Sequence, residues 1–358
     1  MKNLILFELR KILYQKLSLI SIIAVFLLSA LFAFSTYQNM YAYDGVKNEG
    51  TGKTAVQIDK SIAARYEGIL TDDKMKQMMS DFKPAHDLHG MNAKYLYYNA
   101  MQSAVFARFS DINGNWNGLN VSDVFGNEEI KIGYINGWLH TSQNFAETLI
   151  ILSVVIILII APVFSSEYNG VDSIILASKY GRTKCGMAKV AASFITSLLL
   201  TILAAVFNLA FAILLYGFEG LDCSILFAQP SFTEGFIPFN ITCGTLLKYQ
   251  MMLAVTSAIS ITGITLFFSA LGKNQMISVV SSVAFQFLPL LLPVSETSSL
   301  FRLIVLLPIY HAQCFSIMSE QQIDGNILYA IWAVPVAIIL MAFGMFFSPK
   351  IFARHQVL

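Results

Sequence analysis

The sequence predicts an all-α membrane protein, and two observations carry that prediction: the composition and the length of the uncharged stretches. Of the 358 residues, 56% are hydrophobic and 13% are charged, whereas about a quarter of the residues in an average soluble domain are charged. A helix needs roughly 20 residues to cross about 30 Å of hydrocarbon. We expect six transmembrane helices, because six stretches without Asp, Glu, Lys or Arg approach or exceed that length: 17–34, 148–166, 190–218, 249–272, 274–295 and 326–349.

Residues 1–16 predict a separate helix that lies in the cytoplasmic interface of the membrane. Ile5, Leu9 and Ile12 fall on one helical face, as is typical of an interfacial amphipathic helix. Three basic residues between positions 10 and 16 would be costly inside hydrocarbon. The alternative is that this segment continues directly into the first membrane-spanning helix, which we place at residues 17–36.

The distribution of basic residues predicts that both termini are cytoplasmic. The short outer loops of this orientation hold only Arg302, with Lys248 at a helix edge. Such an asymmetry sets orientation under the positive-inside rule. The eleven basic residues of the inner segments are Lys2, Arg10, Lys11, Lys16, Lys179, Arg182, Lys184, Lys189, Lys273, Lys350 and Arg354.

Residues 37–144 then form a large extracellular domain, which we expect to be mainly helical. Apolar residues recur at helical spacing in 55–79 and 93–109, and turns rich in Gly and Asn interrupt the domain. Residues 145–358 hold helices two to six. Within them, 303–317 is short for a span and is interrupted by Pro308, so we expect a re-entrant segment before the last helix.

No pattern for catalysis, metal binding or nucleotide binding is complete in this sequence. Residues 50–54 read Gly-Thr-Gly-Lys-Thr, but the first glycine of a phosphate-binding loop would fall on Lys47, and no strand pattern precedes it. His86 and His89 lack the further ligands that a metal site needs. We therefore expect no enzymatic activity, no catalytic residue, no metal and no cofactor in this chain, and no nucleic-acid partner.

The expected spans contain few groups that a proton or an ion would use. Away from the ends of the spans, Asn208 and Gln286 are the only strongly polar residues, whereas ion-coupled carriers usually hold ionisable groups at the midplane of the membrane. This disfavours intrinsic proton coupling, and we interpret the two amides as interhelical hydrogen-bonding groups. In one outer loop, Cys223 and Cys243 are candidates for a disulfide in an oxidising exterior. Two free thiols are the alternative.

The loop 165–189 carries an ordered set of charged residues and glycines. Together with six spans, an inner interfacial helix and a broken segment before the last span, this loop resembles that of the membrane subunit of ATP-binding-cassette exporters of the type-2 permease superfamily. The resemblance implies that the loop begins with a short coupling helix seated in a groove of a separate ATPase. The residues concerned are Glu167 and Gly170, then Lys179, Gly181, Arg182, Lys184 and Lys189.

Two features depart from that family pattern. The residues before Arg182 are Lys179-Tyr180-Gly181, where many members carry a proline. The connection after the first span is also larger than in many members. The plainer interpretation of the loop is that its basic residues only anchor helix ends at the inner leaflet.

The resemblance also implies partners, cargo and location. A separate ATPase subunit would bind ATP and Mg, and a second copy of this chain or a related permease would complete a dimeric pathway in the bacterial plasma membrane, in contact with lipid. The cargo would be a peptide, an antibiotic or another amphipathic molecule. Three alternatives stay open: a sensor or immunity protein whose outer domain binds a peptide without transport, a sodium or other ion efflux permease, and a channel.

Overall fold

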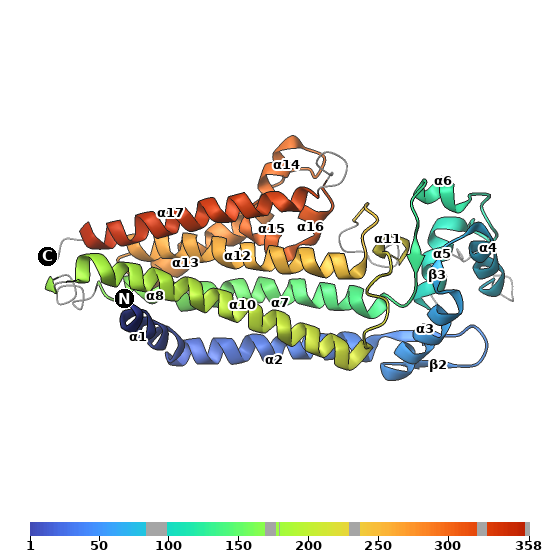
Figure 1. Cartoon of the computed structure of the whole chain (residues 1–358), viewed down its shortest axis with the longest axis horizontal. Coiled ribbons are helices and arrows are strands. Elements are labelled where there is room, and N and C mark those ends of the chain that lie inside the picture. Colours follow the sequence, from blue (N-terminus) through green and yellow to red (C-terminus); the bar gives the residue numbers. More distant parts are fainter. Residues whose placement is uncertain (84–98, 169–176, 179, 229–236, 321–327, 355–358) are drawn as a thin grey trace. The chain divides into compact units, whose positions relative to one another are not determined.

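The computed structural model describes residues 1–83, 99–168, 177–178, 180–228, 237–320 and 328–354, and this described part is mostly helical. It divides into two compact units. The first comprises 1–29, 145–207 and 250–358, and the second comprises 30–144 and 208–249. Among the described residues, five helices are long and apolar enough to cross a membrane, so the chain has the character of a multi-pass membrane protein (Figure 1).

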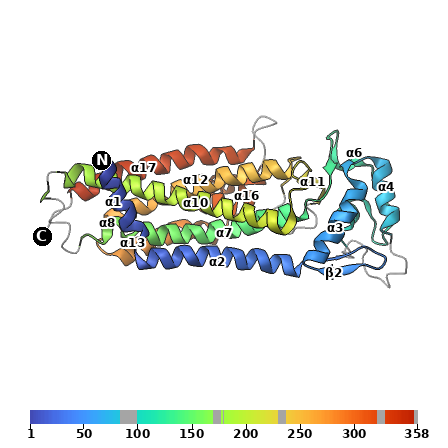
Figure 2. The same cartoon turned by 60° about the horizontal axis from the view of Figure 1, so that its bottom comes forward.

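These five helices follow five of the expected uncharged stretches, with shifted ends. Within the first unit they run side by side in both views (Figures 1 and 2). They are α2 (Lys16–Asn39), α7 (Asn136–Ile160) continued by α8 (Pro162–Ser165), α10 (Gly186–Tyr216), α12 (Cys243–Leu271), and α17 (Ala333–Arg354) preceded by the 3-10 turn η5 (Tyr329–Trp332).

The amphipathic N-terminal segment is a helix of its own, α1 (Lys2–Leu13), and α2 begins only at Lys16. The alternative of one continuous helix is therefore wrong. Ile12 is buried, and Ile5 and Leu9 pack against the hydrophobic core of the first unit, as the apolar face predicts.

The stretch 274–295 does not form a full-length span. Its helix α13 (Gln275–Phe287) passes into the 3-10 turn η4 (Leu288–Leu291), so the apolar helix is shorter than the five others. Pro289 is at the start of this turn, where its missing N–H prevents an α-helical hydrogen bond. In the described part of the chain, five of the six expected spans are thus present as long helices.

The segment expected to be broken consists of three short helices, α14 (Ser299–Ile304), α15 (Pro308–Gln313) and α16 (Phe315–Met318). Pro308 occupies the first position of α15, a position where the lack of an N–H costs nothing. Cys314 separates α15 from α16 with a φ of 60°, in the left-handed region that non-glycine residues rarely adopt.

Two glycines allow α12 and α17 to approach closely in the first unit. A Cβ on Gly344 would overlap the carbonyl oxygen of Gly263, and a Cβ on Gly263 would overlap the carbonyl oxygen of Leu340. Small residues at a helix crossing let the two backbones touch, which is common in membrane helices. The last long helix is therefore held against α12 by backbone contact.

The described part of the second unit is mainly helical, as expected, and it also holds two small antiparallel sheets. The sheets pair β1 (Tyr41–Tyr43) with β2 (Glu49–Thr51) and β3 (Gly68–Ile69) with β4 (Lys131–Ile132). The helices are α3 (Lys53–Tyr66), α4 (Asp72–Asp81), α5 (Ala100–Phe109), α6 (Val121–Phe125) and α11 (Ile225–Ala228).

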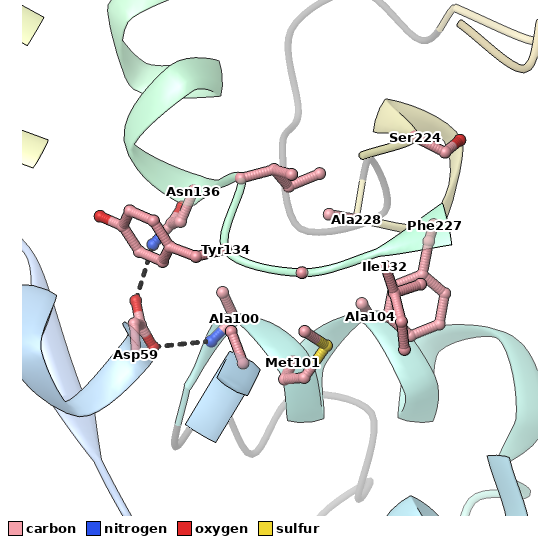
Figure 3. Close-up of a pocket in the computed structure, with 13 residues that line it drawn as sticks. Asp59, Ala100, Met101, Ala104, Ile132, Tyr134, Asn136, Ser224, Phe227 and Ala228 are labelled. Atoms are coloured by element: carbon pink, nitrogen blue, oxygen red, sulfur yellow. Dashed lines mark hydrogen bonds between the residues drawn. The ribbon is translucent and has the colours of Figure 1, made fainter. Parts of the chain in front are cut away.

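A small cavity of about 20 Å³ lies in the second unit beside Asp59, enough for about one water molecule. Asp59 is 5% exposed. Its carboxylate accepts hydrogen bonds from Asn136 Nδ2 at 2.9 Å and from the Ala100 backbone N–H at 3.3 Å (Figure 3). One buried carboxylate thus joins α3 to the first residues of α5 and α7.

Candidate functional site

Four charged side chains of the first unit, Glu8, Lys11, Glu167 and Lys189, meet in an ionic cluster in which all but Lys11 are buried. Lys189 Nζ lies 3.1 Å from each carboxylate oxygen of Glu8 and 2.6 Å from Glu167 Oε1. Lys11 Nζ lies 2.6 Å from the same oxygen of Glu167. The Lys189 side chain is 0% exposed, and the Glu167 side chain is 3% exposed. Two carboxylates and two ammonium groups make the cluster neutral.

Helix α1 supplies one acid and one base to this cluster. Glu8 and Lys11 are three positions apart, so they lie on neighbouring parts of one helical face. Ile12, one position further on, is buried in the hydrophobic core. The cluster therefore lies at the edge of the core, where the polar face of α1 meets the body of the first unit.

The backbone around Glu167 is fixed by the end of α12. The Ser269 hydroxyl accepts a hydrogen bond from the Phe164 N–H at 3.0 Å, and the Tyr168 hydroxyl donates to the Ala270 carbonyl at 2.6 Å. Each of these bonds satisfies a polar group at a helix end, where the helix itself leaves groups unpaired. Glu167 thus enters the cluster from a rigid turn.

Lys189 enters from the other end of the loop, one turn inside α10. A short π-helical turn, η2 (Gly181–Cys185), leads into this helix. A Cβ on Gly186 would lie 3.2 Å from the Cβ of Pro349, so the start of α10 packs closely against α17. The two ends of the loop are therefore anchored on α12 and α17 and are joined to each other through the cluster.

The energetics of buried ion pairs explain how this arrangement positions its helices. A buried ion pair contributes little net stability against an apolar alternative, but removal of one partner is costly because a buried charge is left uncompensated. The cluster therefore fixes which residues of α1, the loop and α10 lie together. Glu167 Oε2 has no hydrogen-bond partner among the described residues, so the carboxylate does not have its full set of hydrogen bonds.

The residues predicted for ATPase coupling fall into three groups. Glu167 and Lys189 are buried and come together in the cluster. Gly181 and Lys184 lie in η2, where the exposed Lys184 ammonium is 4.2 Å from the centre of the Tyr180 ring. Gly170, Lys179 and the side chain of Arg182 lie outside the described residues.

Sequence reasoning missed Glu8 and Lys11 as members of this site. In the sequence, Glu8 lies outside the apolar face of the N-terminal helix, yet it is 6% exposed. Its partner Lys189 is 181 positions away, and no local pattern indicates such a pairing. The available signal was an acid followed three positions later by a base on one helix, the same acid-then-base order as Glu167 and Lys189 on the loop.

Two other predictions concern uncharged polar groups. Gln286 is fully buried, but neither its side-chain nitrogen nor its side-chain oxygen has a hydrogen-bond partner among the described residues, so the prediction of an interhelical hydrogen bond is not met there. Asn208 is buried as well. Cys223 and Cys243 are free, buried thiols in the structure, and their pairing stays a prediction.

Metal ligation receives no support from the described part of the chain, where no three His, Cys, Asp or Glu side chains lie together as a metal site would require. His86 and His89 lie outside the described residues. No family model, curated protein or solved structure matches this chain.

Proposed function

We propose that this chain is the membrane subunit of an ATP-driven exporter and that a separate ATPase acts on it through the loop 165–189. The observation that carries this proposal is the ionic cluster. Glu167 at one end of the loop and Lys189 at the other are tied to each other and to α1 by buried charge-assisted contacts of 2.6 to 3.1 Å. A force on the loop would therefore reach α1 and α10 together.

The exposed residues of the loop suit contact with a partner. Tyr180 is 46% exposed and Met187 is 40% exposed, and Lys184 is exposed between them. Aromatic residues and methionine are enriched in protein interfaces, and a positive charge beside them can complement an acidic patch of a partner. We assign ATPase contact to these exposed side chains, whereas Glu167 and Lys189 act from the interior as anchoring groups.

The finer membrane layout follows from the same proposal. The apolar segment Gln275–Leu291 spans about 27 Å as an α-helix with a final 3-10 turn, a length that modest thinning of a bilayer accommodates. We propose it as the fifth of six spans, with α14 to α16 as a re-entrant segment. Both termini and the loop are then cytoplasmic, and residues 37–144 are extracellular.

The proposed cycle needs two permease chains and two ATPase subunits. Closure of the ATPases on ATP would shift the loops and reorient two packed helix bundles between inward-facing and outward-facing states, a rigid-body change of a known kind. The expected cargo is a peptide, an antibiotic or another amphipathic molecule in the bacterial plasma membrane.

Site-directed photocrosslinking tests the ATPase contact. A photoreactive amino acid replaces Tyr180 or Met187 in the full chain in its native cell, and the matched control carries it at Val46, which is 84% exposed in the second unit. We expect an ATP-binding protein to crosslink from the two loop positions and not from position 46. Crosslinking from position 46 alone, or none to an ATPase, contradicts the proposal.

A charge reversal then tests coupling in the purified complex. Lys184→Glu should weaken ATPase docking by roughly tenfold, about 1.4 kcal/mol, whereas Lys273→Glu, also exposed but outside the loop, should not. Transport that requires ATP in sealed vesicles separates the exporter from a sensor or a channel. ATP-independent flux, or ligand binding without flux, would favour those alternatives.

A further inference from the structure

Cys223 and Cys243 face each other across a short antiparallel contact in the second unit. The contact is a bridge between Ser224 and Thr242, flanked by two backbone hydrogen bonds of 3.0 Å. In one of them the Cys243 N–H donates to the Cys223 carbonyl. In an antiparallel pair, the residues that flank a bridged pair also lie opposite each other, so this register places the two cysteines directly across from one another.

This register meets the geometric requirement for a disulfide. Opposed residues that exchange both backbone hydrogen bonds in an antiparallel pair have Cα atoms about 5.5 Å apart, and disulfides join Cα atoms separated by roughly 4.4–6.8 Å. Here one of the two bonds is present, while the Cys223 N–H donates to the Gly220 carbonyl. Directly opposed side chains also lie on the same face of the pair.

The surroundings of the pair exclude solvent. Cys223 is 0% exposed and Cys243 is 1% exposed. The Cys223 thiol donates a weak hydrogen bond to Asp222 Oδ1 at 3.9 Å. Burial, reinforced by the Asp222 carboxylate, raises the pKa of the Cys223 thiol to about 11. Because the thiolate is the reactive form, this cysteine is unsuited to catalysis or to rapid exchange in the folded protein.

We propose that Cys223 and Cys243 form an intramolecular disulfide during folding outside the membrane. The oxidant is a disulfide of a thiol oxidoreductase. One cysteine thiolate attacks a sulfur of the oxidant to give a mixed disulfide. The thiolate of the other cysteine then attacks the sulfur of the first cysteine and displaces the oxidant. The two chain cysteines lose two electrons and their two protons, and the oxidant leaves as a dithiol. Burial then protects the new bond from reduction.

The bond would fasten the chain that follows α10 to the first residue of α12. The cysteines are 20 positions apart, and a crosslink over such a loop stabilises the fold mainly by restricting the unfolded chain. Ser224 N–H also donates to the Lys131 carbonyl of β4 at 2.8 Å. The disulfide would thus hold this edge of the second unit to the start of a long helix.

The pair is specific among the four cysteines of the chain. Cys314 lies in the first unit, where its sulfur accepts a hydrogen bond from Gln250 Nε2 at 3.0 Å. Cys185 lies in η2, on the loop that we place in the cytoplasm. The proposal rests on the proposed orientation of the chain, but it requires no partner ATPase.

Mass mapping of the full-length protein tests the disulfide. Protein purified from its native membrane is alkylated in denaturant before and after reduction. We expect two of the four cysteines to be alkylated before reduction and all four afterwards, with a linked peptide joining positions 223 and 243. Alkylation of all four before reduction, or a linkage through Cys185 or Cys314, overturns the proposal.

Single serine variants supply the matched control. A reductant should lower the thermal midpoint of the wild-type protein and leave that of Cys223→Ser or Cys243→Ser unchanged. An equal response of wild type and variants overturns a stabilising disulfide, and if the variants do not fold, the mapping of wild-type protein still decides. The photocrosslinking experiment at Tyr180 and Met187 is independent of the redox state, so failure of the disulfide and failure of the exporter proposal are distinguishable.

Discussion

Lys189 and Glu167 form an ion pair of 2.6 Å in which both side chains are buried, although the two residues begin and end a loop of which part lies outside the described residues. A carboxylate and an ammonium group excluded from water must each have a partner. The pair therefore fixes the two ends of the loop side by side, whatever the intervening chain does.

Replacing Lys189 should destabilise the first unit strongly. Lys189→Met leaves the buried carboxylates of Glu8 and Glu167 with only Lys11, whose side chain is 36% exposed, so the free energy of unfolding should fall by roughly 3–5 kcal/mol. Thermal unfolding of the detergent-purified protein measures this. Lys184→Met, at an exposed position of the same loop, should change stability by less than about 0.5 kcal/mol. Equal effects of the two substitutions would refute the buried cluster.

The close crossing of α12 and α17 predicts a second loss of stability. Gly344→Leu would drive a side chain into the backbone of Gly263, and the helices must separate, at a cost of roughly 2–4 kcal/mol. Ala342→Leu makes a comparable enlargement at an exposed position of the same helix and should be tolerated. The comparison uses the fraction of monodisperse protein and its thermal midpoint. If Gly344→Leu is tolerated as well as the control substitution, the crossing is not as close as described.

The buried carboxylate of Asp59 predicts a pH dependence for the second unit. Burial raises the pKa of Asp59 to about 6, against an ordinary value of 3.8, although hydrogen bonds from Asn136 and Ala100 oppose this shift. Because the folded state then binds the proton more tightly than the unfolded state, this group's contribution to stability is fully present below about pH 4. It is lost as the pH rises through about 6.

The magnitude of this contribution is at most roughly 3 kcal/mol, at 1.36 kcal/mol for each pKa unit. Hydrogen exchange at the start of α5, followed between pH 7 and pH 4, measures it as the difference between wild type and Asp59→Asn, which cannot titrate. The wild-type protein should gain protection relative to the variant as the pH falls. Parallel profiles would show that Asp59 is not protonated in this range.

The sequence predicted the long helices well because their signal is local. An uncharged apolar stretch of 18 or more residues is sufficient for a helix in lipid, and five of the six expected stretches correspond to long helices. The helix of the remaining stretch, 274–295, is short because Pro289 changes the helix type near its end. The sheets of the second unit have strands of two or three residues, too short for an alternating pattern to appear in the sequence.

The ionic cluster was only half predictable, and the reason is the distance between its members in the chain. Glu167 and Lys189 were predicted as coupling residues of the loop 165–189. The helix that holds Lys189 begins at Gly186, however, and places this ammonium in the buried interior. The expected span began at Val190 because a charge was expected to end it. Glu8 and Glu167 together compensate this charge, and the contact with Glu8 over 181 positions leaves no trace in local spacing.

Gln286 offers a last test, since it is a polar residue in the interior of the first unit. Its amide is fully buried on α13 without a partner among the described residues, and an unpaired buried polar group costs roughly 1–3 kcal/mol. Gln286→Leu should therefore raise the free energy of unfolding by about that amount. Gln250→Leu is the matched control, because it removes the hydrogen bond to Cys314 and should not stabilise. If Gln286→Leu stabilises the protein but abolishes ATP-dependent transport, the amide is retained for the cargo pathway. If the substitution lowers stability instead, the amide has a hydrogen-bond partner, either a bound water or a residue outside the described part of the chain.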